Sequence, residues 1–134
     1  MSEKPLPVPT PTSQPFWDAL RQHRVRIQHC ARCERWVYYP RSHCPFCLGP
    51  ELEWRDVSGE GTLYTFTIAR VPTAPPFADE VPQKLAVVEL DEGPRLTSTL
   101  VNVEPEQIKI GMRVRPVFDD LEEAEVTLLR YEPA

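Results

Sequence analysis

The segments Cys30–Cys33 (CARC) and Cys44–Cys47 (CPFC) decide how the rest of this chain is organised. They are two C-x2-C pairs, and together they contain all four cysteines of the 134-residue sequence. The two thiolates of such a pair can bind the same metal ion, and two pairs supply the four ligands of a tetrahedral site. Disulfide bonds would instead require an oxidising compartment, which nothing in the sequence indicates. The expected metal ligands are Cys30, Cys33, Cys44 and Cys47.

Zinc is the expected metal, with iron as the alternative. Tetrahedral sulfur coordination suits both metals, and rubredoxin-type iron sites use the same paired cysteines. Glu34 and Leu48 follow the two pairs, at positions where small residues would let backbone amides approach the sulfurs and tune an electron-transfer site. This pattern favours zinc. Because four thiolates leave no position for water or substrate, the metal would stabilise the fold and take no part in catalysis.

The charge of the chain is unevenly distributed. Its formal net charge is −5, which argues against general binding to nucleic acids, because affinity for phosphate backbones comes mainly from lysine and arginine. Residues 21–41, however, contain six arginines and one glutamate. We therefore expect one local basic surface on an acidic protein.

Residues 1–12 predict an extended arm, because prolines alternate with other residues along most of this segment. The segment lacks the charged and apolar regions of a secretory signal. No stretch of the sequence approaches the roughly 20 apolar residues that a membrane-spanning helix needs. Together with reduced cysteines, these features predict a cytoplasmic protein without a membrane partner.

A short helix is expected from Ser13 to about His23. Ser13 provides a hydroxyl N-cap, and a proline lies in the first turn, where it is favoured. Phe16 and Leu20 are four residues apart and share one face, with Trp17 beside them. That face could pack on the same chain or could dock a partner or a ligand.

Three short strands are expected around the cysteine pairs, at residues 25–28, 36–39 and 51–57. Segments of this length cannot hold one another, so the metal would join them. We assign residues 13–57 to one unit, which combines the helix with a metal ribbon.

A second unit is expected at residues 58–134. β-branched and aromatic residues are concentrated in residues 62–70, which is the most strongly indicated strand. Five strands without a long helix between them favour a five-stranded OB-like barrel, with an open β-sandwich as the alternative. The predicted fold is therefore mainly β. The other four strands are expected at residues 85–90, 95–103, 112–118 and 125–131.

Several motifs follow one another in a recognisable order along the chain. They are Pro15–Trp17, the two cysteine pairs with Tyr39–Arg41 between them, Ser58–Thr67, Leu90–Leu96 and Ile110–Val114. Through these motifs, over about residues 14–133, the chain resembles the family called domain of unknown function thirty-five. The resemblance implies a rubredoxin-like zinc ribbon joined to an OB-fold.

The resemblance also implies an accessory role in acyl-CoA metabolism. Members are similar to partner subunits of thiolases, thiolase-like aldolases and acyltransferases, in which they help to form the acyl-CoA site while the partner performs the chemistry. We therefore expect a zinc-containing subunit of a hetero-oligomer that binds acyl-CoA with its partner and is not an enzyme on its own.

The residues themselves agree with a non-catalytic role. The metal uses every cysteine, and the sequence contains neither a G-x-S-x-G motif nor a Gly-rich phosphate loop. Guanidinium groups match the geometry of phosphates, and aromatic rings can stack on adenine. In the alternative interpretation the aromatics are the small core of the ribbon and the arginines are a solvated face. The candidate contacts with acyl-CoA or a partner are Phe16, Trp17, Arg35, Trp36, Tyr38 and Arg41.

Two other functions are alternatives. A nucleic-acid-binding OB module would stack bases on aromatics of a barrel face, and Tyr64 and Phe66 are expected on one side of strand 62–70. The acidic barrel half argues against this function. A rubredoxin-like electron carrier would hold iron in the cysteine site.

Overall fold

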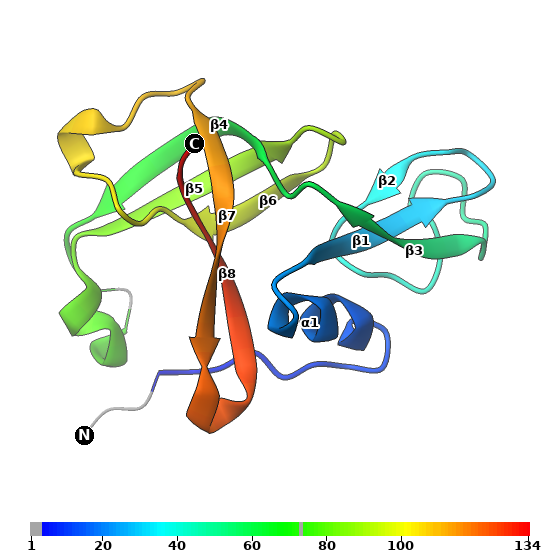
Figure 1. Cartoon of the computed structure of the whole chain (residues 1–134), viewed down its shortest axis with the longest axis horizontal. Helices are drawn as coiled ribbons and strands as arrows, with labels where there is room; N and C mark the ends of the chain where they lie inside the picture. The colour runs from blue at the N-terminus through cyan, green and yellow to red at the C-terminus, as the bar shows by residue number, and fades with distance from the viewer. Residues whose placement is uncertain (1–3, 73) are drawn as a thin grey trace.

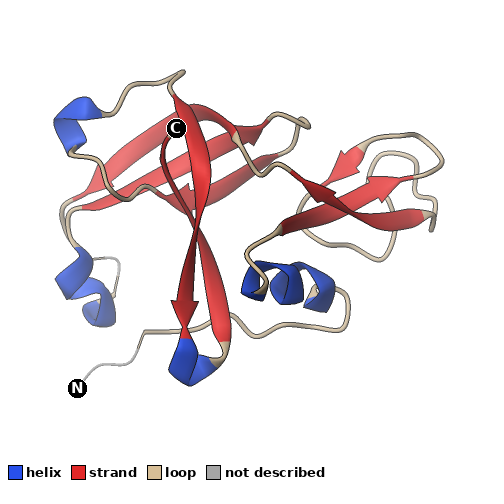
Figure 2. Cartoon of the chain, viewed as in Figure 1, coloured by secondary structure: helices blue, strands red, loops and turns tan. Residues whose placement is uncertain are grey.

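The computed structural model describes residues 4–72 and 74–134 of the chain. As the sequence predicts, the fold is mainly β, with an N-terminal helix and two antiparallel sheets (Figure 1; Figure 2). Three short 3₁₀ helices lie in its connections. The elements are α1 (Gln14–Arg21), β1 (Val25–Cys30), β2 (Trp36–Val37), β3 (Leu52–Val57), β4 (Gly61–Ala69), η1 (Pro75–Glu80), β5 (Gln83–Leu90), β6 (Arg95–Thr99), η2 (Pro105–Gln107), β7 (Arg113–Leu121), η3 (Glu122–Ala124) and β8 (Val126–Pro133).

The expected N-terminal arm precedes α1. Its residues 1–3 lie outside the described residues, and residues 4–10 contain neither helix nor strand. Lys4 pairs with the carboxylates of Asp79 and Glu80 on η1, at 3.2 and 2.6 Å. No helix among the described residues has the length and apolar character that a membrane span needs.

The first sheet has the strand order β2-β1-β3. β1 pairs with β3 along its whole length, from Val25 opposite Val57 to Cys30 opposite Leu52. β2 has only two residues, because Tyr38 leaves the sheet and packs against the core of the barrel. β1 is the central strand, and it is buried because one of its faces also packs toward the barrel.

The second sheet has the strand order β6-β5-β4-β7-β8 and closes into a barrel. Closure occurs through a parallel bridge between Leu100 and Tyr131, where the amide of Val101 donates to the carbonyl of Tyr131 at 2.8 Å. This pairing explains why β6 ends at Thr99 and not at Val103, since the chain turns away from β5 to meet β8. The predicted five-stranded OB-like barrel is confirmed.

The barrel encloses the main hydrophobic core. Tyr131 is fully buried, and its hydroxyl donates to the carbonyl of Gly59 at 2.6 Å. Gly59 has a φ of +75°, and a Cβ there would lie 2.6 Å from a methyl group of Val25, so glycine lets the connection between the sheets pass close to β1. The buried core residues are Val25, Ile27, Leu63, Ala86, Val88, Leu90, Leu96, Leu100, Val103, Ile108, Val114 and Tyr131.

A β-bulge changes which residues of β4 face solvent. Leu63 pairs with Val88 and Thr65 with Val87, so Tyr64 is the extra residue. Beyond the bulge the alternation is shifted, and Phe66 packs against the core while Tyr64 is exposed. The prediction that Tyr64 and Phe66 lie on one side of the strand is therefore wrong.

The helix α1 packs on its own chain through the face expected from the sequence. Phe16 and Leu20 are buried against the ribbon and the barrel. Ser13 precedes the helix but does not cap it through its side chain, because its hydroxyl accepts a hydrogen bond from the amide of Thr10 at 2.9 Å.

The C-terminus of α1 is a Schellman motif, which places the end of the helix at Arg21 and not at His23. His23 adopts a left-handed conformation with φ of +57° and donates its amide to the carbonyl of Leu20 at 2.9 Å. The amide of Arg24 donates to the carbonyl of Ala19, also at 2.9 Å. The chain then enters β1 directly.

Candidate metal centre and ligand groove

The four cysteine sulfurs converge on one point between the two loops of the ribbon, and all lie within 4.8 Å of one another. The Sγ atoms of Cys30 and Cys47 are 3.6 Å apart, as are those of Cys33 and Cys44. Sulfurs bound to zinc at about 2.3 Å in a tetrahedron lie about 3.8 Å apart. The geometry of the donor set therefore fits a four-coordinate metal ion.

The two cysteine loops have the same backbone conformation. The amide of Glu34 donates to the carbonyl of Cys30, and the amide of Leu48 donates to that of Cys44, both at 2.8 Å. Glu34 and Leu48 adopt left-handed φ angles of +61° and +63°. A side chain at such a position costs about 1–2 kcal/mol, so a bound metal would hold two loops in a conformation that their sequence does not favour.

The environment of the thiols couples metal binding to protonation. Burial raises the pKa of Cys33 to about 12. Burial also disfavours the thiolate of Cys44, but the backbone amides of Cys47 and Phe46 outweigh it and lower the pKa to about 7. Because a metal binds thiolates, its binding must displace protons from this cluster.

Gln28 holds the loop between the two cysteine pairs. Its side-chain amide donates to the carbonyl of Arg41 at 2.8 Å, and its oxygen accepts from the amide of Arg41 at 2.7 Å. Gln28 is buried, although the alternating pattern of its strand suggests an outward polar residue. We call this pair of hydrogen bonds the Gln28 clasp.

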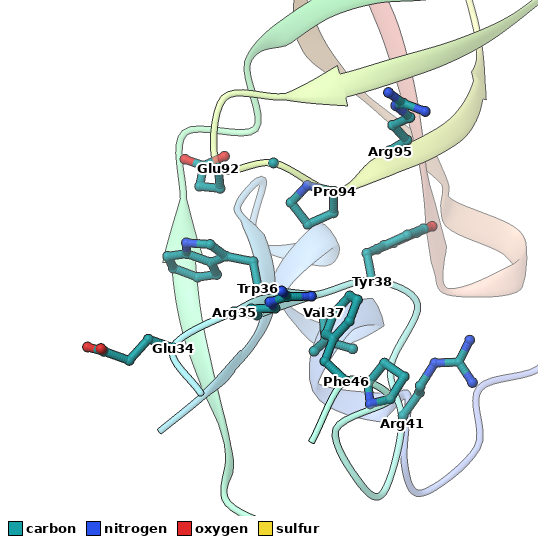
Figure 3. Close-up of a pocket in the computed structure, with 12 residues that line it drawn as sticks. Glu34, Arg35, Trp36, Val37, Tyr38, Arg41, Phe46, Glu92, Pro94 and Arg95 are labelled. Atoms are coloured by element: carbon teal, nitrogen blue, oxygen red, sulfur yellow. The ribbon is translucent and has the colours of Figure 1, made fainter. Parts of the chain in front are cut away.

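A groove with a volume of about 620 Å³ lies between the ribbon and the turn that joins β5 to β6 (Figure 3). Four of the six predicted contact residues line it, and these are Arg35, Trp36, Tyr38 and Arg41. We call it the ligand groove. Its remaining lining residues are Glu34, Val37, Pro45, Phe46, Glu92, Gly93, Pro94 and Arg95.

The arginines of the predicted basic segment are used in different ways. Arg24 and Arg26 pair with Asp56 at 2.7 and 2.6 Å, and Arg26 above all holds the pKa of Asp56 below its usual range. Arg35 and Arg41 make no ion pair with any described residue. Arg35 and Arg41 therefore bring positive charge to the ligand groove that no ion pair among the described residues neutralises.

Aromatic and acidic side chains complete the ligand groove. The guanidinium of Arg35 lies 4.6 Å above the ring of Phe46, which is 56% exposed. Arg95 lies 3.8 Å above the ring of Tyr64 and pairs with Glu89 at 3.0 Å, so it is already partly neutralised. The groove thus combines an exposed ring with two guanidinium groups that remain available.

Glu92 contributes a buried acceptor to the ligand groove. Its Oε1 atom is buried and has no hydrogen-bond partner among the described residues. The other carboxylate oxygen accepts only long hydrogen bonds from Ser58, at 3.4 and 3.5 Å. A buried acceptor without a donor is unfavourable, so a rotation of Glu92 that brings Oε1 to a donor on a ligand would be favoured.

The other two predicted contacts, Phe16 and Trp17, line a second hollow of about 240 Å³ between α1, β6 and β8. Tyr38 lines this hollow too. Phe16 is only 2% exposed and packs edge-to-face on Tyr38, at a centroid distance of 5.7 Å. Trp17 is partly exposed, and its indole donates to the hydroxyl of Tyr39 at 3.2 Å. We call this hollow the crevice.

The histidines do not build a catalytic site within the described part of the chain. His23 pairs with Asp120 at 2.8 Å, and His29 packs against Trp36. His43 lies 3.1 Å from the hydroxyl of its neighbour Ser42, but no described carboxylate hydrogen-bonds to it. No nucleophile, base and orienting acid come together here.

The residues that sequence reasoning missed are those brought to the ligand groove from outside the basic segment. Pro94 and Arg95 come from the β5–β6 turn, and Glu92 precedes them. The pattern Asp-Glu-Gly-Pro indicates a turn, but nothing in it indicates that the turn faces the ribbon. Phe46 lies within the second cysteine pair. Its apolar ring beside Pro45 was the one feature of the local sequence that could have indicated a groove residue.

Comparisons with known proteins agree with this architecture. Residues 17–53 match the family model described as the rubredoxin-like zinc ribbon domain of ChsH2, and residues 54–119 match that of the C-terminal OB-fold domain of ChsH2. Among solved structures, a chain of the Ltp2-ChsH2(DUF35) aldolase superposes with a TM-score of 0.83 at 33% identity. That match covers 96% of this chain and 98% of the other.

Two curated relatives extend the comparison. A probable enoyl-CoA hydratase alpha subunit from Thermomonospora curvata is 40% identical over 121 residues, which are 89% of this chain but only 37% of the relative. A DUF35 domain-containing scaffold protein from Methanocaldococcus jannaschii is 38% identical over 101 residues, which are 74% of this chain and 68% of the relative. The chain therefore belongs to the DUF35 family, whose ChsH2-type members join a rubredoxin-like zinc ribbon to an OB-fold.

Proposed function

We propose that this protein is a non-catalytic, zinc-containing accessory subunit that binds a thiolase-like enzyme, namely a thiolase, an acyltransferase or an aldolase, and contributes to its acyl-CoA site. The observation that carries the proposal is the ligand groove, in which Arg35 and Arg41 stand beside exposed aromatic surface without an ionic partner among the described residues. Guanidinium groups bind phosphates through two parallel hydrogen bonds, and coenzyme A is rich in phosphate.

The names of the relatives support a role within a complex. One relative is named as an alpha subunit of an enoyl-CoA hydratase, one as a scaffold protein, and the solved structure as an aldolase with two named components. The first name includes a CoA ester. A subunit that holds the CoA portion while its partner performs the chemistry would account for a groove without catalytic residues.

Zinc is the metal we assign to the cysteine site. Cys30, Cys33, Cys44 and Cys47 supply four thiolates at the spacing that zinc requires, and such a site is closed to substrate. Bound zinc would hold the two loops of the ribbon together and so keep Arg35 and Arg41 in place. The proposed location is the cytoplasm, where the thiols remain reduced.

The outer face of the barrel offers little to a nucleic acid. The shallow hollow over β4, β5 and β6 is lined mostly by threonines and aliphatic residues, and its one ring, Phe66, packs partly against the barrel core. None of these lining residues is a cation, whereas single-strand binding combines stacking rings with positive charge. An acyl-CoA role therefore has more support than the nucleic-acid alternative.

The proposal is tested by affinity purification of the tagged chain from its native host, with metal analysis of the eluate. We expect a thiolase, acyltransferase or aldolase to co-purify with bait that carries one equivalent of zinc, and the complex to bind acyl-CoA. Iron in a red eluate would support the electron carrier instead. A bait that stays monomeric and binds no acyl-CoA would overturn the proposal.

A matched pair of variants shows whether the ligand groove is involved. Arg35→Ala removes a guanidinium of the groove, whereas Arg55→Ala removes an exposed guanidinium of β3 whose one ion pair among the described residues is with Glu53. We expect acyl-CoA affinity of the complex to fall about tenfold or more in Arg35→Ala, as the loss of a charged hydrogen bond implies. Arg55→Ala should retain the original affinity.

A further inference from the structure

The ligand groove and the crevice share a continuous wall. Along β6, Arg95 lines the groove, and the residues that follow it, Leu96–Thr99, line the crevice. Tyr38 of the ribbon lines both hollows. An extended ligand that lies in the groove can therefore continue past Tyr38 into the crevice while it stays in contact with the protein.

The two ends of the ligand groove differ in chemistry. In Figure 3, Glu92 and Trp36 lie at one end, while Arg41 and Tyr38 lie toward the other. The Oε1 of Glu92 is buried and lacks a donor among the described residues, and a rotation of the side chain would bring it to an adenine amino group or a ribose hydroxyl in the groove. An indole ring offers a stacking surface for a base. This end suits the adenosine of a nucleotide.

The middle of the ligand groove suits phosphates. Arg35 lies between the two ends in Figure 3, with its guanidinium over the ring of Phe46 at 4.6 Å. Arg35 in the middle and Arg41 toward the far end give these parts of the groove a positive charge that no described carboxylate neutralises through an ion pair. The phosphates would then lie between the adenosine and Tyr38.

The crevice has a different character. Leucine and aromatic side chains of α1, β6 and β8 form most of its wall, and the threonines Thr97 and Thr99 add hydroxyl groups. A pantetheine arm consists of methyl and methylene groups with amides between them. Such a chain needs apolar contact and a few hydrogen-bonding groups, and the crevice provides both.

We infer that the protein holds coenzyme A in two parts, with the adenosine and phosphates in the ligand groove and the pantetheine arm running past Tyr38 into the crevice. This inference rests on the proposed function and specifies how it operates. The thioester would then emerge from the crevice beside α1, where a partner enzyme can reach it. Tyr38 is the positioning residue at the point where the two parts meet.

Tyr38 is suited to this place because its ring is fixed and its hydroxyl stays protonated. Phe16 packs on the ring edge-to-face, and the ring also packs against the barrel core. Burial raises the pKa of Tyr38 to about 12, so the hydroxyl is a hydrogen-bond donor at neutral pH. A donor at this point could bind an amide carbonyl of the pantetheine arm.

The test is to measure, by calorimetry on the zinc-loaded full chain and on its purified complex, the affinity of two probes. The probes are coenzyme A and adenosine 3′,5′-bisphosphate, which lacks the pantetheine arm. We expect coenzyme A to bind at least about tenfold more tightly, because only it can fill the crevice. Equal affinities of the two probes would overturn the inference.

Two matched variants separate the hollows. Thr99→Phe adds a ring at a residue that lines the crevice, and Thr67→Phe makes the same change at an exposed position of β4 outside it. We expect Thr99→Phe to lower the affinity for coenzyme A about tenfold and to leave that for the bisphosphate unchanged. Thr67→Phe should alter neither, and Arg35→Ala should lower both.

The outcomes distinguish this inference from the proposed function. If the complex binds coenzyme A but Thr99→Phe has no effect on it, the two-part binding is wrong while the accessory role stands. If neither probe binds the chain or its complex, the inference and the acyl-CoA part of the proposed function both fail. Unchanged zinc content and melting temperature in each variant confirm that the fold is intact.

Discussion

The ribbon and the barrel hold short strands together in different ways. The ribbon's own buried cluster consists of Cys30, Val37 and Cys44, whereas the barrel core extends over all five of its strands. Two residues of β1, Val25 and Ile27, belong to the barrel core although their strand belongs to the ribbon sheet. Hydrophobic burial therefore anchors the near end of the ribbon, and a bound metal would need to stabilise only the loops at its far end.

Loss of one sulfur should have the largest effect. Cys44→Ser removes a metal ligand, and structural zinc sites contribute about 10–16 kcal/mol to folding in small zinc-finger peptides. We expect the metal to be lost and the segment between Cys30 and Leu52 to unfold, while the barrel stays folded. Metal analysis and amide NMR spectra would show this, with Ser42→Ala as the control in the same loop. Retained zinc with an unchanged melting curve would contradict the prediction.

A cavity in the barrel core should destabilise the barrel without loss of metal, in contrast to Cys44→Ser. Leu63 is fully buried, so Leu63→Ala is expected to lower the free energy of unfolding by about 2–5 kcal/mol through lost contacts and the cavity left behind. The metal content should stay at one equivalent. Denaturant titration measures the effect, and Thr65→Ala on the exposed side of β4 serves as control. Loss of metal from Leu63→Ala would mean that the two regions are not independent.

Loss of the Gln28 clasp should have an effect of intermediate size on stability. Gln28→Ala leaves the carbonyl and the amide of Arg41 without their partners, at a cost of about 2 kcal/mol. Faster hydrogen exchange of the Arg41 amide would report the loss. Gln14→Ala, which removes an exposed glutamine of α1, should leave that exchange rate unchanged. If the Arg41 amide exchanges at the same rate in both variants, the Gln28 side chain does not protect it.

Stability at alkaline pH tests how completely the contact between the ribbon and the barrel buries Tyr38. Burial raises the pKa of Tyr38 to about 12, whereas an unfolded tyrosine ionises near pH 10. Stability from this group is therefore fully present below about pH 10 and is lost as the pH rises through the folded pKa, by up to about 1.4 kcal/mol per pH unit. Tyr38→Phe should flatten this decline in denaturant titrations, and the exposed Tyr64→Phe should not. An equal effect of both would contradict the burial of Tyr38.

The smallest expected effect is a gain. Leu48 has a φ of +63° and is 76% exposed, so Leu48→Gly relieves backbone strain and loses little burial. After the greater freedom of the unfolded glycine chain is taken into account, the net stabilisation should be about 0.5 kcal/mol. Denaturant titration of the zinc-loaded protein checks this. A less stable variant would show that the exposed leucine makes contacts that outweigh its strain.

Features set by local sequence were predictable in this protein. The spacing of Cys30, Cys33, Cys44 and Cys47 indicated the metal site because each pair closes on itself over a few residues. The strands of the barrel were indicated by runs of β-branched and aromatic residues. The ligand groove was only half predictable, since Arg35 and Trp36 are neighbours in sequence but Glu92 arrives from another sheet. Whether these residues contact acyl-CoA stays a prediction.

Non-local pairing accounts for the rest. The bulge at Tyr64 follows from how β4 pairs with β5, and a strict alternation cannot show it. The burial of Gln28 depends on the loop at Arg41, thirteen residues away. The early end of β6 depends on Tyr131, which belongs to the last strand. Each of these differences arises where one segment adjusts to a partner that its own sequence does not identify.

The Gln28 clasp also affects which amino acids can replace Arg41 during evolution. It binds only backbone atoms of residue 41, so any amino acid except proline at that position would be held in the same place. Evolution can therefore exchange the side chain that residue 41 contributes to the groove without rebuilding the loop that carries it. Descendants with a different residue 41 would differ in the chemistry of the groove while the architecture stays constant.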